Sequence, residues 1–172
     1  MGSIISTTHD NLTVAVRLNE VEAYGGMEDS ASHAYRSQTV RNTPMWGPSG
    51  TVYVYLSYGI HWCSNIVTGP EGSPSAVLLR GGDVVEGIDA AMERRGRDDH
   101  LADGPGKLSQ TLGLDGSASG TLLTDGPLTI GPPFGSVTQI ESTARIGISR
   151  GKHLPWRFVE QRSTDRSSST IP

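Results

Sequence analysis

The sequence predicts a single domain of the α+β class, and three observations lead to that prediction. The chain has 172 residues, which is within the usual size of one domain. Several short segments alternate apolar and polar residues as strands do, and two others repeat apolar residues as helices do. Glycine (22 residues) and proline (10 residues) are abundant, as is typical of a protein with many turns. We expect this domain to span residues 1–162 and the polar residues 163–172 to form a disordered tail.

Two strands are expected near the start of the chain. Ile4-Ile5 belongs to the first, and residues 12–24 form a longer second run. The cluster His9-Asp10-Asn11 between them favours a turn. Because Met1-Gly2 is followed at once by a strand, we expect that an N-terminal piece is absent. The polar residues 27–50 then form a long loop, and such a loop inside a compact domain is usually functional or disordered.

A β-hairpin is expected over residues 51–65. Apolar and polar residues alternate over residues 52–57 and again over residues 60–65, and Tyr58-Gly59 interrupts the pattern as a tight turn. We interpret Tyr53 as a residue of a half-buried sheet, because tyrosine has a high strand propensity. Tyr58 is expected to point outward, since a large aromatic side chain beside glycine at a turn has little core to fill.

The middle of the chain predicts a strand and then a helix. Residues 76–80 form a short apolar strand that ends before Gly81-Gly82. Asp83, with Glu86 three residues later, has the spacing of a capping box, so we expect a helix to begin there.

The second helix is expected between Pro105 and Gly113, in the usual order of proline near the start and glycine after the end. Further strands, separated by turn residues, are expected at residues 121–123, 128–130, 137–140, 145–148 and 156–158.

Composition excludes several classes of protein. The formal net charge of −4 argues against a nonspecific coat on nucleic acid, although six cations gather between Arg145 and Arg166. That stretch is equally well a phosphate-binding face or an ordinary solvated charge run. The single cysteine, Cys63, excludes an internal disulfide and a cysteine-cluster metal site. The sequence has neither an 18-residue apolar run nor a basic-then-apolar leader, so we expect no membrane span and a cytoplasmic location, nucleoid-associated in a bacterium.

Five residues point to one ligand pocket. Glu22 and Tyr24 end a strand, His33 lies in the loop that follows, and Tyr55 and Tyr58 belong to the hairpin expected beside it. Aromatic faces bind a flat heterocycle by stacking, which contributes about 1 to 3 kcal/mol per base. A carboxylate beside such a pocket can act as a general base toward water. From the residues alone, a solvated Glu22 and a surface His33 remain the simpler alternatives.

Blocks of sequence from about residue 12 to residue 158 resemble the alkyladenine (3-methyladenine, methylpurine) DNA glycosylase family. No single block is specific, but their order along the chain is. The matching blocks are Glu20-Val21-Glu22-Ala23-Tyr24, Ser32-His33, Arg41-Asn42 with Met45-Trp46-Gly47-Pro48, residues 50–65, Val77-Leu78-Leu79-Arg80, Gly104-Pro105-Gly106-Lys107-Leu108 and Pro155-Trp156-Arg157-Phe158.

The resemblance implies a monofunctional enzyme that flips a damaged purine out of duplex DNA and hydrolyses its N-glycosidic bond with water. Glu22 would deprotonate the water, and Arg80 would position it. The implied roles of the remaining residues are base binding by Tyr24, His33, Tyr55 and Asn65, intercalation by Tyr58, and phosphate contacts by Arg41, Lys107, Arg145 and Arg157. The resemblance implies no cofactor and no metal ion, and we expect a monomer whose partner is double-stranded DNA.

The same resemblance implies a curved antiparallel β-sheet with flanking helices and a protruding β-hairpin. We expect the chain to depart from the family by the absence of its N-terminal helical segment, and it carries Trp46 in place of a smaller apolar residue. We also expect the extra Gly25-Gly26 to loosen the loop that carries His33. Two other functions remain open, namely a noncatalytic nucleic-acid-binding module and a hydrolase of free nucleosides. The preferred lesion among 3-methyladenine, 7-methylguanine, hypoxanthine and ethenoadenine is equally open.

Overall fold

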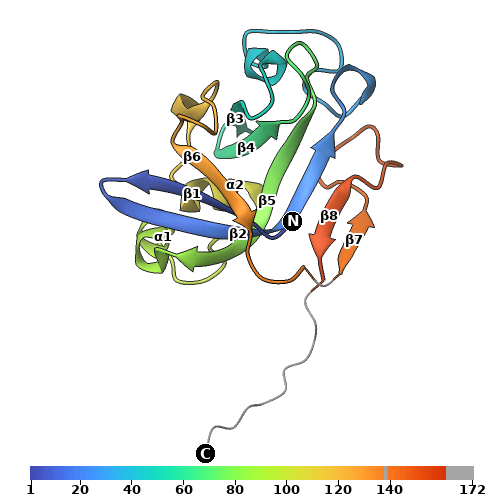
Figure 1. The fold of residues 1–172 in the computed structure, drawn as a ribbon. Coiled ribbons are helices and arrows are strands. Elements are labelled where there is room, and N and C mark those ends of the chain that lie inside the picture. The colour runs from blue at the N-terminus through green and yellow to red at the C-terminus, as the bar shows by residue number, and fades with distance from the viewer. Residues whose placement is uncertain (138, 162–172) are drawn as a thin grey trace, which may run out of the picture.

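The sheet organises the whole molecule (Figure 1). The computed structural model describes residues 1–137 and 139–161, so the tail expected over residues 163–172 lies outside the described residues. In the described part, eight strands form one antiparallel sheet and two α-helices pack against it, which confirms the predicted α+β class. The strands are β1 (Ser3–His9), β2 (Leu12–Tyr24), β3 (Val52–Ser57), β4 (His61–Val67), β5 (Ala76–Glu86), β6 (Leu128–Pro133), β7 (Ile140–Thr143) and β8 (Arg157–Glu160).

Strand β2 holds the sheet together. The strand order is β3-β4-β5-β2-β1-β6, and β8 joins β2 and β7 outside this path. The first half of β2 pairs with β1, whereas residues 20–22 pair with β8, and β5 lies along the other edge of both halves. Asp10 and Asn11 connect β1 to β2 with positive φ angles of 52° and 63°, as the predicted turn requires.

Strand β5 is longer than predicted, and the expected helix start at Asp83 is wrong. Gly81 and Gly82 lie inside the strand rather than after it. A Cβ atom on Gly82 would come within 2.5 Å of the Arg17 carbonyl oxygen, so glycine allows β2 and β5 to approach closely there. Helix α1 (Ile88–Arg95) begins only after Gly87, whose φ is +70°.

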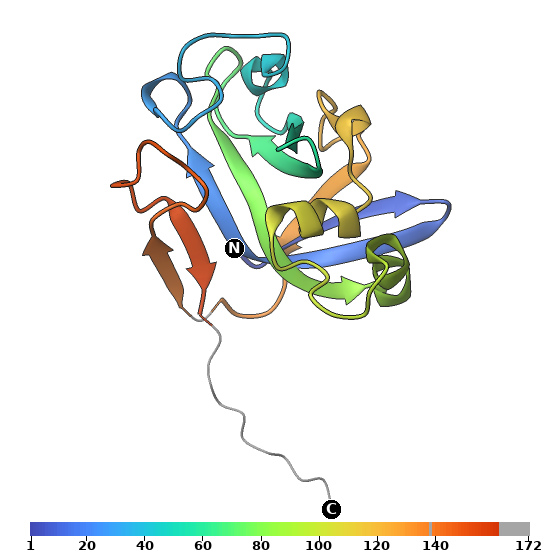
Figure 2. The same cartoon turned by 180° about the vertical axis from the view of Figure 1, so that it is seen from behind.

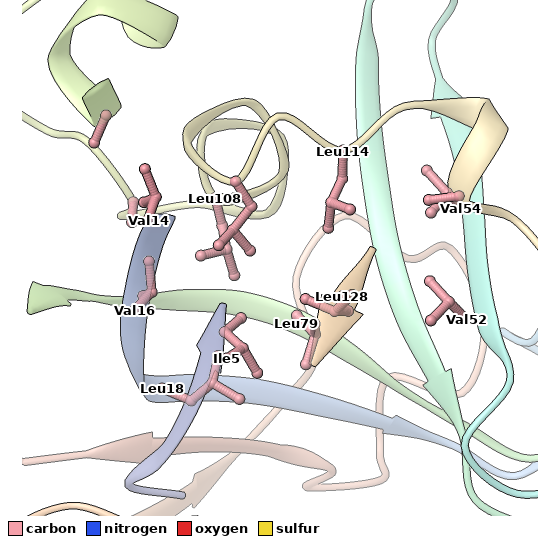
Figure 3. Packing of buried hydrophobic residues seen from close by; sticks show 14 of the residues in the cluster. Ile5, Val14, Val16, Leu18, Val52, Val54, Leu79, Leu108, Leu114 and Leu128 are labelled. Atoms are coloured by element: carbon pink, nitrogen blue, oxygen red, sulfur yellow. The ribbon is translucent and has the colours of Figure 1, made fainter. Parts of the chain in front are cut away.

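Helix α2 (Pro105–Thr111) confirms the second helix prediction. Seen from behind, it lies across the sheet (Figure 2). Both helices and one face of the sheet enclose the main core, part of which is drawn in Figure 3. The core includes Ile5, Val14, Val16, Leu18, Val52, Val54, Leu79, Leu108, Leu112 and Leu128. No helix in residues 1–137 or 139–161 is both long enough and apolar enough to cross a membrane.

Several strand predictions in the last third of the chain are wrong in position. Leu122 makes only an isolated bridge with Thr51, and residues 145–148 form no strand and contain bends at residues 146 and 147. Strand β7 begins at Ile140 rather than at residue 137, and β8 begins at Arg157. These segments are short, so long-range pairing rather than local alternation decides where their strands begin.

The loop after β2 contains two short turns and packs closely against other segments at its glycine pair. Short 3-10 turns form at Gly26–Glu28 and Thr43–Trp46, and Met45 is buried in a second apolar cluster with Tyr53. A Cβ atom on Gly26 would lie 2.9 Å from the Pro74 carbonyl oxygen, and one on Gly25 would lie 3.1 Å from the Trp156 ring. The glycine pair therefore lets this loop pack closely against its neighbours.

Candidate active site

A pocket of about 500 Å³ opens where the C-terminal end of β2 meets the β3–β4 hairpin. Its wall also includes residues 30–33 after β2 and residues 146–150 between β7 and β8. The volume is within the range of small-molecule sites, which is roughly 300 to 1,000 Å³. Seven of the residues predicted for the site line it, namely Tyr24, His33, Arg41, Tyr55, Tyr58, Asn65 and Arg80.

Glu22 lies directly behind the pocket wall and is not solvated. Its exposed fraction is 0%. The Tyr24 hydroxyl donates to one carboxylate oxygen at 2.9 Å, and the Ile146 amide donates to the other at 2.7 Å. An Arg80 guanidinium nitrogen lies 3.3 Å from that second oxygen. Because a buried carboxylate is costly unless it is paired and hydrogen-bonded, these three groups from three segments are what allow Glu22 to be here.

A second carboxylate, Glu20, organises the arginines beside Glu22. Arg80 on β5 and Arg157 on β8 both donate their Nε–H to the same Glu20 oxygen, at 2.6 and 2.7 Å. Burial acts to raise the pKa of Glu20, but the hydrogen bonds from Arg157 and Arg80 hold it below its usual value. The Arg80 guanidinium is thereby held between two carboxylates of the same strand.

Aromatic rings form another part of the pocket wall. The rings of His33 and Tyr55 meet edge to face with centroids 4.5 Å apart, and those of Tyr53 and Tyr55 are 5.6 Å apart. The His33 Nδ1 atom is 2.9 Å from the Tyr53 hydroxyl. Tyr53 was expected only to belong to a half-buried sheet, but it is fully buried and also contacts the pocket residue His33.

The electrostatic state of this wall follows from its surroundings. The His33 ring faces the open pocket, yet the protein around it desolvates the charged form and, with Arg41 nearby, lowers its pKa. Burial, together with the charge of Glu22, raises the pKa of Tyr24. Burial likewise raises the pKa of Tyr55. At neutral pH the wall therefore holds neutral rings that can stack on a planar ligand, even a cationic one.

Asn65 and Tyr58, the two remaining pocket residues in the prediction, differ in exposure. Asn65 is buried, and its amide nitrogen donates to the Tyr53 carbonyl at 3.0 Å, which fixes the side chain against the strand. Tyr58 lies at the hairpin turn with a φ of 50° and is 88% exposed. Ile60 beside it is also exposed. The prediction that Tyr58 points away from the core is confirmed, so the pocket has an apolar projection at its mouth.

The four cations expected to contact phosphate lie in different environments. Arg41 is exposed at the pocket and lies over the Tyr55 ring at 5.4 Å. Lys107 is partly exposed and pairs with Asp103 at 2.8 Å. Arg157 is half-buried against Glu20. The predicted phosphate contact of Arg145 is wrong. Its side chain is 0% exposed and forms a buried ion pair with Asp29, so it has no access to a phosphate.

Three contributors to the site were missed by the sequence prediction. Ile146 acts through its backbone amide, so its side chain carried no signal. Asp29 lies in a polar loop, and its partner Arg145 is 116 positions away in the chain. Glu20 lies in the matched block beside Glu22, and the two-residue spacing on one strand was a signal that could have identified it.

The arrangement suits proton transfer next to a bound flat ring. A carboxylate held by hydrogen bonds can accept a proton from water, and aromatic faces can orient a heterocycle above it. In residues 1–137 and 139–161, no group of three or more His, Cys, Asp or Glu side chains is close enough to hold a metal ion.

Comparisons with known proteins identify the family. The chain matches the family described as Methylpurine-DNA glycosylase (MPG) over residues 1–164. It is 50% identical over 159 residues to a protein of Frankia casuarinae, which covers 84% of this chain and 75% of that protein. A protein of Methanoculleus marisnigri is 47% identical over 155 residues, covering 87% of this chain and 80% of the relative. Both relatives carry the name "Putative 3-methyladenine DNA glycosylase". The chain therefore belongs to the methylpurine-DNA glycosylase family, a family of DNA repair hydrolases that act on N-glycosidic bonds.

Proposed function

We propose that this protein excises alkylated or deaminated purines from duplex DNA by hydrolysing the N-glycosidic bond with water. The observation that carries the proposal is the carboxylate of Glu22, which is fully buried behind a base-sized aromatic pocket and hydrogen-bonded by Tyr24 and Ile146. A carboxylate is seldom buried for stability alone, because its desolvation opposes folding.

In this mechanism Glu22 is the general base and Arg80 is the positioning cation. Tyr24, Arg80 and Ile146 all line the pocket, so the attacking water reaches Glu22 from the pocket side. As the base departs, the sugar develops oxocarbenium character, which the ionised carboxylate stabilises. An alkylated purine already carries positive charge and leaves readily. One carboxylate is then sufficient where sugar-cleaving hydrolases commonly use two.

The extruded base lies between Tyr24 on one side and His33 and Tyr55 on the other. A neutral His33 that accepts a hydrogen bond from Tyr53 at Nδ1 carries its proton on Nε2, which leaves a donor for the base. Asn65 lines the pocket, and its assigned role is to disfavour the 2-amino group of an undamaged guanine. These contacts favour alkylated and deaminated purines over normal ones.

Tyr58 fills the gap left in the stacked duplex, and Arg41, Lys107 and Arg157 hold the backbone. Removing a base from the stack costs a few kcal/mol, and an inserted apolar side chain offsets part of that cost. The protein acts as a monomer with no lyase step. In support, no lysine is among the described residues that line the pocket, so no amine is placed to form a Schiff base.

The test is release of free base from duplex oligonucleotides that carry one hypoxanthine and, separately, from methylated DNA. Abasic sites are measured by alkaline cleavage for the wild type and for Glu22→Gln. Release by the wild type, and its loss in a variant that still binds the duplex, supports the proposal. A folded wild type that releases nothing but binds abasic duplex tightly would indicate a binding module instead.

Tyr58→Ala separates the proposal from hydrolysis of free nucleosides. If the substrate is a base within duplex DNA, loss of the wedge lowers release by about 5- to 150-fold, the equivalent of one stacking contact of about 1 to 3 kcal/mol. Release from a free nucleoside is the matched control, because no stack is broken there. Equal activity of both proteins on duplex DNA contradicts the assigned role of Tyr58.

A further inference from the structure

The Asp29–Arg145 ion pair is buried next to the pocket and takes no direct part in the proposed reaction. Both side chains are 0% exposed, and the guanidinium contacts both carboxylate oxygens, at 2.5 and 2.8 Å. Arg145 also donates to the Ala23 carbonyl at 3.0 Å and lies over the rings of Tyr24, at 4.7 Å, and Trp156, at 5.3 Å. One arginine thus joins the end of β2 to the segment before β8.

Asp29 connects the loop after β2 to Arg145. Its carboxylate accepts the backbone N–H groups of Gly25 and Ala31, at 3.2 and 3.0 Å. Burial acts to raise the pKa of Asp29, but Arg145 and these two amides hold it below its usual value, so the pair is ionised at neutral pH. Asp29 therefore connects the loop that leads to His33 to Arg145.

Both hydrogen-bond donors of Glu22 lie next to this pair. Ile146, whose amide donates to Glu22, is the residue directly after Arg145. Tyr24, whose hydroxyl donates to Glu22, lies under the Arg145 guanidinium and directly after Ala23, whose carbonyl Arg145 binds. We propose that the Asp29–Arg145 ion pair is a positioning device that presents the Ile146 amide and the Tyr24 hydroxyl to the carboxylate of Glu22. This inference rests on the proposed role of Glu22 as the base.

A consequence can be measured in the pH profile of base release. Several charged and titratable groups surround Glu22. From its own strand these are Tyr24 and Glu20, and from neighbouring segments they are Arg80 of β5, Arg157 of β8, which acts through Glu20, and Arg145 with the Ile146 amide before β8. A carboxylate that accepts fewer hydrogen bonds is protonated more easily. Loosening the ion pair should therefore move the acidic limb of the profile to higher pH.

The experiment uses the full chain with Asp29→Asn, single-turnover base release at a series of pH values, and affinity for abasic duplex. We expect the acidic limb to move up by about one pH unit, which is the size of one lost hydrogen bond to a charged group, with affinity little changed. Arg145→Lys keeps the cation but cannot contact both oxygens, so it should give a smaller shift in the same direction.

The matched control is Glu160→Gln. Glu160 forms a comparable two-pronged pair with Arg17, at 2.5 and 2.9 Å, and neither residue lines the pocket. This variant is expected to lose stability and to keep the wild-type limb. A folded Asp29→Asn protein whose profile coincides with that of the wild type would overturn the proposal, as would an equal shift in Glu160→Gln.

A measurement on the wild type keeps the proposal testable if the variants do not fold. In ¹⁵N-labelled protein the Ile146 amide proton should shift at the same pH as the acidic limb, because it is bonded to Glu22. An Ile146 amide that does not respond to pH would overturn the positioning role. A wild type that releases no base would overturn the proposed function, while this amide would still report whether Ile146 is bonded to Glu22, which the positioning role requires.

Discussion

The two halves of strand β2 are paired in the same way but have opposite chemistry. In the first half, Val14, Val16 and Leu18 point into the main core, where burial of apolar surface stabilises the fold. In the second half, Glu20 and Glu22 occupy alternate positions and direct carboxylates into the protein. Both halves have neighbouring strands on both edges, so the difference lies in the side chains and not in the backbone.

Along this one strand, the first half contributes mainly to stability and the second half to the proposed chemistry. The apolar half needs only close packing, whereas the charged half needs specific partners from other segments. Arg80, Arg157 and the Ile146 amide come from β5, from β8 and from the segment before β8. A group that requires so many partners weakens folding when any one is lost, and such groups are commonly kept for function. The comparison predicts that the two halves respond differently to mutation and to acid.

The largest effect is expected for Glu22→Gln. Loss of a general base lowers the rate by about 10²- to 10⁴-fold. The amide oxygen can still accept from Ile146, the amide nitrogen can donate to the Tyr24 hydroxyl, and Arg80 keeps Glu20, so the free energy of unfolding should change by less than about 1 kcal/mol. Single-turnover base release and urea unfolding measure the two quantities. A variant that loses both stability and activity would contradict the claim that the second half of β2 serves chemistry more than stability.

The reverse result is expected for Leu18→Ala in the core half. Leu18 is buried, and truncation of such a leucine costs about 2 to 5 kcal/mol of unfolding free energy. Base release per folded molecule should be unchanged, because Leu18 does not line the pocket. Urea unfolding gives the stability, and active-site titration corrects the rate for the folded fraction. A slower chemical step in this variant would mean that core packing also sets the geometry of Glu22.

Acid should act on the charged half alone. The folded-state pKa of Glu20 lies below its usual value, so its contribution to stability is complete above about pH 5 and is lost as the pH falls through the lowered pKa. The stability difference between wild type and Glu20→Gln should therefore shrink as the pH falls, whereas that for Leu18→Ala should stay constant. Urea unfolding at several pH values between about 3 and 7 measures both. Parallel pH curves for wild type and Glu20→Gln would contradict this assignment.

The same contrast explains how much the sequence could predict. Alternation is a local signal, so it identified the strands of the core half and the β3–β4 hairpin, with Tyr58 pointing outward. It did not indicate that Tyr53 is fully buried. The length of β5 was missed because the reason for Gly82 is the close approach of β2, which no local pattern contains.

In the site, family blocks identified pocket residues, but they could not reveal which cations are exposed. Arg145 lies in a basic stretch that resembles a surface, and its burial depends on Asp29, which is distant in the chain. The role of Ile146 belongs to a backbone amide and is independent of the side chain. The type of a residue therefore predicts its chemical role better than it predicts which distant residues it contacts.

The smallest effect is expected for Tyr24→Phe, which removes one hydroxyl from the charged half. The ring remains to stack on a base and on Arg145, and Arg80 and Ile146 still hold Glu22. The acidic limb of base release should move to higher pH by less than about one unit, because one of several bonds to the carboxylate is lost. Burial and Glu22 raise the pKa of Tyr24, so the wild-type hydroxyl remains a donor in alkali. The wild-type rate should therefore show no fall near pH 10, where an ordinary tyrosine titrates. A fall there that is absent in Tyr24→Phe would mean that Tyr24 ionises in the working enzyme, and that burial does not isolate the charged half from solvent.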